Sequence, residues 1–199
     1  MREDVERWEA KYQAADPEPE LRTDPLLSRH LAELQTSGSA LDLASGSCHS
    51  AVFLAKHGYD VLAVDCSSTG LAIGSRLAQR ERTTIKTQVA DLDDFALDKE
   101  VYNLVVCFRY LNRALFPLMK ATLKVGGLLF FKTFNVHHLA SAPKFNPAYV
   151  LQPGDLYQSF KDMAVSYKHL RAPETDSYIV CRLLLEKKRG GGGGGGGGG

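Results

Sequence analysis

The chain has 199 residues, of which 24 are basic and 23 are acidic, so its formal net charge is +1. A nearly neutral chain lacks the positive field that draws proteins onto nucleic acid or anionic lipid, and we expect no nucleic-acid partner. We also expect no membrane association, because no apolar stretch approaches the roughly 20 residues that cross a bilayer. The polar, acidic N-terminus lacks the pattern of a signal peptide, and we therefore expect a cytoplasmic protein.

Two further features of composition bound the prediction. The four cysteines are widely separated and form no C-x-x-C pair. We expect small buried thiols and no bound metal. Residues 190–199 are all glycine. Since a glycine run has no side chain to bury, we interpret it as a non-native linker or a stand-in for unassigned residues. The remaining length suits one domain, which we expect to be a monomer or a homodimer.

The first elements predict a helical cap. Residues 3–14 are good helix formers, and Trp8 and Tyr12 fall on one helix face. These two rings either anchor the helix in the core or also close over a ligand. A second helix is expected over 26–34, with Asp24 as its N-cap and Pro25 at its first position.

Strand-like and helix-like segments then alternate. This pattern predicts an α/β fold with a doubly wound, mostly parallel, seven-stranded, Rossmann-like sheet. We expect strands at about 40–44, 60–65, 84–89, 103–108 and 128–134, and helices at about 49–57, 68–80 and 112–123. Two last strands, at about 161–167 and 177–186 with a turn at 172–176, predict a C-terminal antiparallel hairpin.

Two acids end the first two expected strands and indicate a nucleoside site. Asp65 lies 19 residues after Gly46, the separation at which a carboxylate reaches a ribose hydroxyl. The intervening turn has Ala44, Gly46 and Cys48 where a dinucleotide site needs glycines against a pyrophosphate. Asp42 would repel a pyrophosphate, but it suits a ligand with an ammonium and a sulfonium, unless it only caps the next helix. The pattern favours S-adenosylmethionine (SAM), with an NAD(P)-dependent oxidoreductase as the weaker alternative.

The ordered motifs resemble those of the class I SAM-dependent methyltransferases. Residues 42–48 match their first motif, D-x-G/A-x-G-x-G, except that Cys48 replaces the last glycine. Residues 65–67, 90–92 and 124–127 are similar to later motifs, and 108–113 with 145–154 look most like the small tellurite-resistance-type enzymes. The resemblance implies one methyltransferase domain over 1–189, with a helical cap at 1–38 and a core at 39–189. It also implies these cofactor-binding residues: Trp8, Asp42, Ala44, Gly46, Asp65, Cys66, Asp91, Leu92 and Phe108.

Acceptor residues are expected after the fourth and fifth strands. Arg109 offers a cationic fork that can bind an anionic substrate, unless it is an ordinary surface residue. Catalytic roles are assigned to Arg113 as a second cationic fork, to Tyr110 as a pocket wall or hydrogen-bond donor, and to His137 as a proton acceptor. The alternative is that Arg113 and Tyr110 are ordinary surface residues and that His137 belongs to a flexible polar loop. Methyl transfer mainly requires alignment, so no dedicated nucleophile is needed. We expect a small, soft or anionic acceptor such as a chalcogen oxyanion or a thiol. A catalytically silent SAM-binding module is the alternative.

Overall fold

The structure, a computed structural model, describes residues 2–34, 36–169 and 176–182. Its strands are β1 (Gly38–Leu43), β2 (Tyr59–Asp65), β3 (Lys86–Val89), β4 (Tyr102–Phe108), β5 (Leu123–Phe134), β6 (Ala164–His169) and β7 (Asp176–Arg182). Its longer helices are α1 (Arg2–Gln13), α3 (His49–Lys56), α4 (Ser68–Arg80) and α5 (Leu115–Thr122). The shorter helical segments are α2 (Pro25–Arg29), η1 (Leu31–Glu33), α6 (His138–Ser141), η2 (Pro147–Tyr149) and α7 (Asp155–Phe160).

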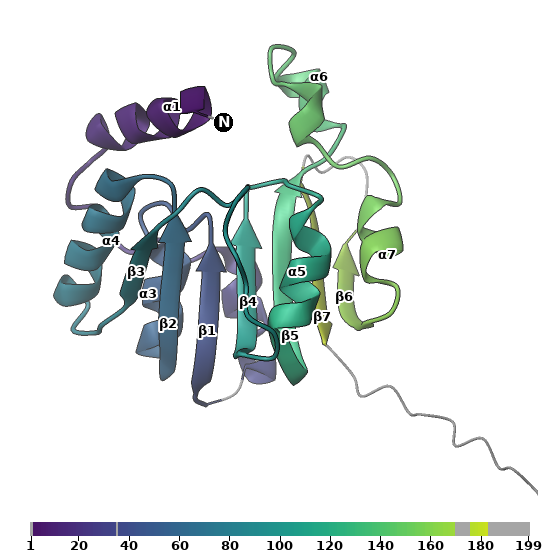
Figure 1. Cartoon of the computed structure of the whole chain (residues 1–199), viewed down its shortest axis with the longest axis horizontal. Coiled ribbons are helices and arrows are strands. Elements are labelled where there is room, and N and C mark those ends of the chain that lie inside the picture. The colour runs from purple at the N-terminus through teal and green to yellow at the C-terminus, as the bar shows by residue number, and fades with distance from the viewer. Residues whose placement is uncertain (1, 35, 170–175, 183–199) are drawn as a thin grey trace, which may run out of the picture.

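The strands form one sheet in the order β3-β2-β1-β4-β5-β7-β6 (Figure 1). Five of them, from β3 to β5, pair in parallel, which confirms the predicted α/β class with a parallel sheet. Antiparallel pairs join β7 to β5 and to β6. Residues 170–175, which include most of the predicted last turn, lie outside the described part of the chain. The strand order reverses between β1 and β4, where sheets of this type bind their ligands.

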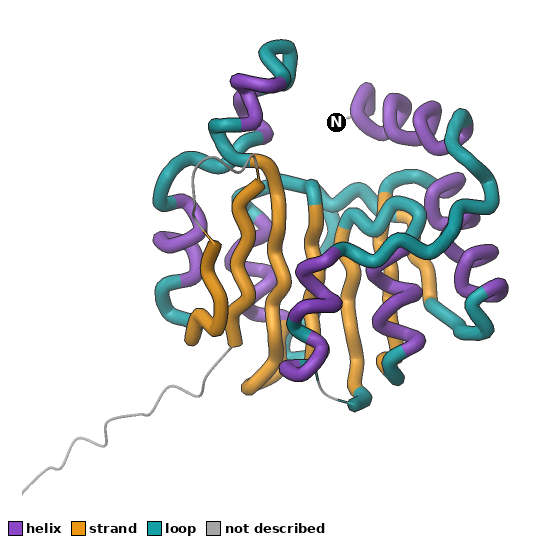
Figure 2. Tube along the Cα trace, turned by 180° about the vertical axis from the view of Figure 1, so that it is seen from behind, coloured by secondary structure: helices purple, strands orange, loops and turns teal. Residues whose placement is uncertain are grey.

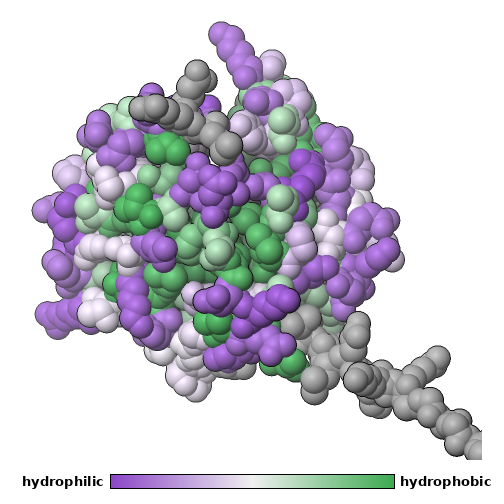
Figure 3. Space-filling view, viewed as in Figure 1, coloured by the Kyte–Doolittle hydropathy of each residue, from purple (hydrophilic) through white to green (hydrophobic). Residues whose placement is uncertain are grey.

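Helices cover both faces of the sheet. α5 and α7 cover the face seen in Figure 1, and α3 covers the opposite face, seen in Figure 2. The apolar side chains divide accordingly: Ala40 of β1 packs with the α3 and α4 cluster, whereas its neighbour Leu41 packs with the α5 and α7 cluster. Burial on both sides explains why these strands are continuously apolar. On the face that α5 and α7 cover, hydrophobic residues gather toward the centre and hydrophilic residues surround them (Figure 3).

Local signals account for several element boundaries. The side chain of Asp24 accepts a hydrogen bond from the Leu26 N–H at 2.9 Å, which confirms the predicted N-cap of α2. The hydroxyl of Ser67 caps α4 in the same way, through the Gly70 N–H at 2.9 Å. These two caps determine where α2 and α4 begin.

Other boundaries differ from the prediction because of tertiary contacts. The single helix expected over 26–34 is wrong: the chain breaks at His30, whose ring packs edge-on against Phe130 of the sheet, 5.9 Å between centroids. The segment after β5, expected to be a loop, contains α6, η2 and α7. Because α7 ends at Phe160, β6 begins later than predicted, at Ala164. Among the described helices, none is long and apolar enough to cross a membrane.

Candidate functional site

A cleft of about 1560 Å³ lies at the carboxyl ends of the parallel strands. α1 lies over one side of these strand ends and α6 rises at the other (Figure 1). The ends of β1, β2, β4 and β5 line the cleft together with α1 and the segment from Lys144 to Tyr149. Twelve of the thirteen residues assigned to the site from sequence line it: Trp8, Asp42, Ala44, Gly46, Asp65, Cys66, Asp91, Leu92, Phe108, Arg109, Tyr110 and Arg113.

The turn after β1 has an alternating left-handed backbone. Ala44, Gly46 and Cys48 have φ angles of 54°, 54° and 57°, a conformation that glycine adopts most readily. A Cβ on Gly46 would lie 2.1 Å from the hydroxyl oxygen of Tyr12, so only glycine fits beneath α1. Cys48 is fully buried and packs against α4, where a Cβ on Gly74 would lie 2.3 Å from its Sγ. Cys48 therefore replaces the motif's last glycine without placing its thiol along the cleft.

Asp42 is the buried acid at the end of β1, and its side chain is only 2% exposed. Its Oδ2 accepts a hydrogen bond from the Ala51 N–H at 3.1 Å, in the first turn of α3. Asp42 therefore both caps α3 and lines the cleft. Burial raises the pKa of Asp42 to about 8. A positively charged ligand beside it would favour the ionised form.

Asp65 joins the two turns that surround the cleft. Its Oδ2 accepts from the Gly46 N–H at 2.8 Å, and its Oδ1 accepts from the Ser67 N–H at 2.9 Å. Each carboxylate oxygen has a second lone pair that a ligand hydroxyl can use. Farther along this edge, Asp91 accepts the Asp93 N–H at 3.0 Å, and Leu92 is buried at 5% exposure. An acid beside an apolar residue suits the polar edge and flat face of a nucleobase.

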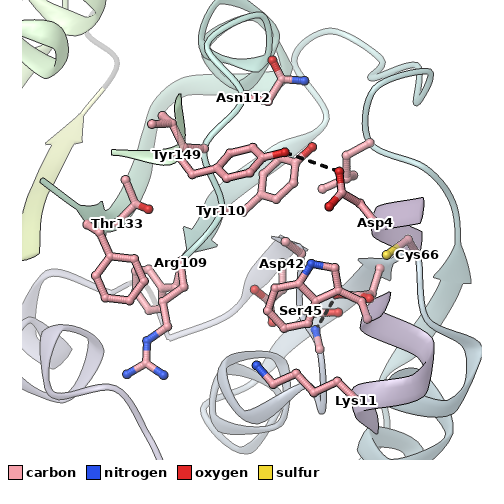
Figure 4. Close-up of a pocket in the computed structure, with 18 of the residues that line it drawn as sticks. Asp4, Lys11, Asp42, Ser45, Cys66, Arg109, Tyr110, Asn112, Thr133 and Tyr149 are labelled. Carbon is pink, nitrogen blue, oxygen red and sulfur yellow. Dashed lines mark hydrogen bonds between the residues drawn. The ribbon is translucent and has the colours of Figure 1, made fainter. Parts of the chain in front are cut away.

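α1 is held over the cleft by Glu9, a residue the sequence analysis missed. The Glu9 carboxylate accepts from the Ser67 hydroxyl at 2.7 Å and from the Thr69 N–H at 3.3 Å, at the start of α4. These hydrogen bonds, with that of the Thr69 hydroxyl, lower the pKa of Glu9 to about 2. Trp8 stacks on Tyr12 with 6.1 Å between ring centroids, and the Lys11 ammonium lies 4.1 Å from the centroid of Trp8. Figure 4 shows Lys11, Asp42 and Ser45 in the same region.

The side chains assigned to the acceptor have distinct surroundings. Arg113 Nη2 donates to Asp155 Oδ2 at 2.6 Å and to the Val150 carbonyl at 3.1 Å. The Tyr110 hydroxyl donates to Asp93 at 3.3 Å, and burial together with this negative charge raises the pKa of Tyr110 far above its ordinary value. Arg109 is exposed, has a φ of 59° and lines the cleft.

The histidine at the cleft differs from the predicted one. His137 is exposed and does not line the cleft, because it lies where α6 begins and the chain turns away. His49 does line it. The Arg22 N–H donates to His49 Nδ1 at 3.2 Å, which places the proton of the neutral ring on Nε2. Burial and the Arg22 charge lower the pKa of His49. In the described residues, no three His, Cys, Asp or Glu side chains are grouped to hold a metal ion.

Sequence comparison matches part of this chain to a known family. Residues 40–127 match the family described as "Methyltransferase domain". The ubiquinone biosynthesis O-methyltransferase of Coxiella burnetii is 30% identical over 100 residues, which are 48% of this chain and 43% of that protein. The chain thus matches less than half the length of the curated relatives.

Comparison of folds agrees with this match. The geranyl diphosphate C-methyltransferase of Streptomyces coelicolor, solved with S-adenosyl-L-homocysteine, has a TM-score of 0.65 at 16% identity, over 80% of this chain and 74% of that one. TehB of Haemophilus influenzae has a TM-score of 0.63 at 16% identity, over 78% of this chain and 60% of that one. Residues 40–127 thus match a methyltransferase domain, and the chain shares its fold with solved methyltransferases.

Proposed function

We propose that this chain is a cytoplasmic enzyme that transfers a methyl group from SAM to a small molecule with a soft or anionic acceptor atom. A chalcogen oxyanion and a thiol are the acceptors that its resemblance to the tellurite-resistance-type enzymes suggests. One observation carries the proposal: two buried acids, Asp42 and Asp65, flank a left-handed turn at the point where the strand order reverses. Doubly wound folds bind nucleosides at this point.

The residues present fit the cofactor. Asp65 would receive the ribose hydroxyls, and Asp42 would face the ammonium group of the methionine moiety. Asp91 and Leu92 would hold the adenine, while Trp8 would cover the bound molecule. When bound, SAM supplies a methyl group already activated on a sulfonium. The protein then needs to align the acceptor with that methyl group and to exclude water.

The acceptor side supports positioning more than proton transfer. The Tyr110 hydroxyl is protonated at neutral pH, burial raises its pKa further, and it already donates to Asp93, so it does not remove a proton. Arg113 is paired with Asp155 and holds the Val150 carbonyl, which makes it a positioning residue for the cleft wall. We therefore propose no role in proton transfer for Tyr110, Arg113 or His137. An acceptor that is already nucleophilic at neutral pH needs none.

Calorimetry with S-adenosylhomocysteine, SAM and NAD tests this function. We expect the two adenosyl compounds to bind and NAD not to bind; NAD binding alone would contradict the proposal. Asp65→Ala should weaken S-adenosylhomocysteine binding by at least about tenfold, or roughly 1.4 kcal/mol. Asp94→Ala, at an exposed neighbouring acid that does not line the cleft, is the matched control. Thermal unfolding of each variant separates lost binding from lost folding. Binding without turnover on any small acceptor would instead indicate a silent SAM-binding module.

A further inference from the structure

The acceptor half of the cleft is aromatic. We use this name for the part lined by Arg109, Tyr110, Phe134, Phe145 and Tyr149, which lie at or after the ends of β4 and β5. Four of these five side chains carry rings, whereas the half beneath α1 is lined by the acids Asp42, Asp65 and Asp91. Asn112, Thr133 and Asn146 also line this part of the cleft, so the acceptor half combines ring surface with a few polar groups.

One wall of the acceptor half is an interlocked group of rings. Phe134 at the end of β5 stacks on His138 of α6 with 4.0 Å between centroids and 16° between planes. Phe145 packs edge-on against both rings, at 5.4 Å from Phe134 and 4.9 Å from His138. Edge-to-face and stacked arrangements of this kind favour a fixed geometry. The wall can accept the face or the edge of another ring without rearranging.

The two tyrosines present rings whose hydroxyl groups are already engaged. The Tyr149 hydroxyl donates to Asp4 of α1 at 3.4 Å, and Figure 4 shows Tyr149 reaching toward Asp4 across the opening. The Tyr110 hydroxyl donates to Asp93, which also accepts from Asn112 at 2.7 Å. Because these hydroxyls are bound to carboxylates, the tyrosines contribute mainly their ring faces to the acceptor half.

Arg109 brings positive charge to the acceptor half. No hydrogen bond or ion pair to its guanidinium is found among the described residues, and its backbone is held in the left-handed region by an N–H bond to the Lys132 carbonyl at 2.7 Å. Lys144 lines the same side and is also exposed. The acids at the rim, Asp4 and Asp93, already accept hydrogen bonds from Tyr149 and Tyr110. Arg109 is thus a planar cation suited to a carboxylate or similar anion.

We propose that the methyl acceptor is a ring-bearing organic acid, with a flat apolar ring against the Phe134 and Phe145 wall and an anionic group at Arg109. This rests on the proposed function and narrows it, since a bare oxyanion would leave the aromatic rings facing water. The step balances without a protein base when the attacking atom is anionic. The acceptor's lone pair forms the new bond to the methyl carbon, the carbon–sulfur bond breaks, and its electrons leave on the sulfur of S-adenosylhomocysteine.

Calorimetry with S-adenosylhomocysteine and four probes tests the acceptor class. The probes are 2-naphthoate, its neutral analogue 2-naphthamide, acetate and selenite, each titrated into the protein saturated with S-adenosylhomocysteine. We expect 2-naphthoate to bind at least about tenfold more tightly than each other probe. Arg109→Gln should reduce naphthoate affinity to that of the amide and leave S-adenosylhomocysteine affinity unchanged. Arg29→Gln, at an exposed arginine of α2 that does not line the cleft, should change neither.

A second pair of variants tests the aromatic wall. Phe145→Leu and Tyr149→Leu should each weaken naphthoate binding severalfold and leave selenite binding unchanged. Tyr149 is 39% exposed, so its variant is expected to fold even if Phe145→Leu does not. The proposed acceptor class would be overturned if selenite bound more tightly than 2-naphthoate. It would also be overturned if Arg109→Gln left the affinity for 2-naphthoate unchanged. Failure of the wild-type protein to bind S-adenosylhomocysteine would instead overturn the proposed function, so the two failures are distinguishable.

Discussion

Cys48 shows how one residue can depart from a motif without changing the site. Its φ of 57° is a conformation that costs a side chain about 1–2 kcal/mol relative to glycine. Its thiol fills the space beside Gly74, so the glycine missing from the turn is matched by one on α4. The cysteine at position 48 therefore contributes to the packing of α3 against α4.

This pairing predicts a coupled pair of substitutions. Gly74→Ala should destabilise the protein by about 1–3 kcal/mol, because the added methyl group overlaps Cys48. Adding Cys48→Gly should restore at least about 1 kcal/mol, since the two positions share the same space. Gln79→Ala, on the exposed face of α4, should change stability by less than about 0.5 kcal/mol. Urea denaturation measures the wild-type protein, Gly74→Ala, Cys48→Gly, the double variant and Gln79→Ala, and additive effects in the double variant would contradict the pairing.

Asp42 gives ligand binding a dependence on pH. Its pKa of about 8 without a ligand means that the carboxyl is largely protonated at pH 7. A ligand ammonium favours the carboxylate, so binding should release a proton and weaken as the pH falls below 8, by at most about tenfold per pH unit. Calorimetric titration of the protein with S-adenosylhomocysteine from pH 8 to pH 6, in buffers of different ionisation enthalpy, measures how many protons are released on binding.

The Asp42→Asn variant isolates this effect. It should remove the proton release above pH 6.5, because the His49 imidazole at the cleft has its pKa lowered below its ordinary value of 6.5 and is mostly neutral there. Affinity that stays constant between pH 8 and pH 6 in the wild-type protein would show that Asp42 does not meet a cation.

At the scale of elements, α1 depends on a few contacts to stay over the site. Tyr12 lies against Gly46 and Gly70. Glu9 accepts a hydrogen bond from Ser67 at the start of α4, and Ser67 lies 58 residues further along the chain. A carboxylate at a helix N-terminus is favoured by the helix dipole. The helix that lies over the cleft is thus attached through the same turn that Asp65 organises.

Loss of the Glu9 carboxylate should loosen α1. Glu9→Ala is expected to speed amide exchange in α1 and weaken S-adenosylhomocysteine binding by about fivefold, as for one partly exposed charge-assisted hydrogen bond. Hydrogen exchange with mass spectrometry and calorimetry give the two readouts, with Glu20→Ala as an exposed control. Since the docked pKa lies below the ordinary value, the contact is complete above about pH 4.5 and is lost as the pH falls toward 2. Unchanged exchange in α1 would refute the attachment.

At the scale of the whole molecule, Arg113 connects the two halves of the chain that build the acceptor side. It follows β4, yet it bonds Asp155 of α7 and the carbonyl of the buried Val150. Arg113→Ala should leave that carbonyl unsatisfied and lower stability by about 1–3 kcal/mol. Arg109→Ala, nearby but exposed, should change stability by less than about 0.5 kcal/mol. We expect faster amide exchange over residues 150–156 in Arg113→Ala but not in Arg109→Ala. Equal exchange rates and equal stabilities of the two variants would contradict this role of Arg113.

The sequence predicted what local patterns encode. Alternating apolar segments predicted the parallel sheet, and Asp42 and Asp65 fall at one edge because parallel strands end together. It did not predict Glu9 or Tyr149, since their partners lie 58 and 145 residues away and no periodicity links them. His137 was placed on the correct segment, but the short helix α6 turns it away from the cleft.

The hydrogen bond between Tyr149 and Asp4 has a kinetic consequence. It spans the opening between α1 and η2, the elements on either side of the cleft. A molecule that fills the cleft from end to end would pass this contact as it enters or leaves. If the chain turns over the proposed substrates, opening of this contact would add a step to product release, and Tyr149→Phe, which removes the hydrogen bond, should speed that release.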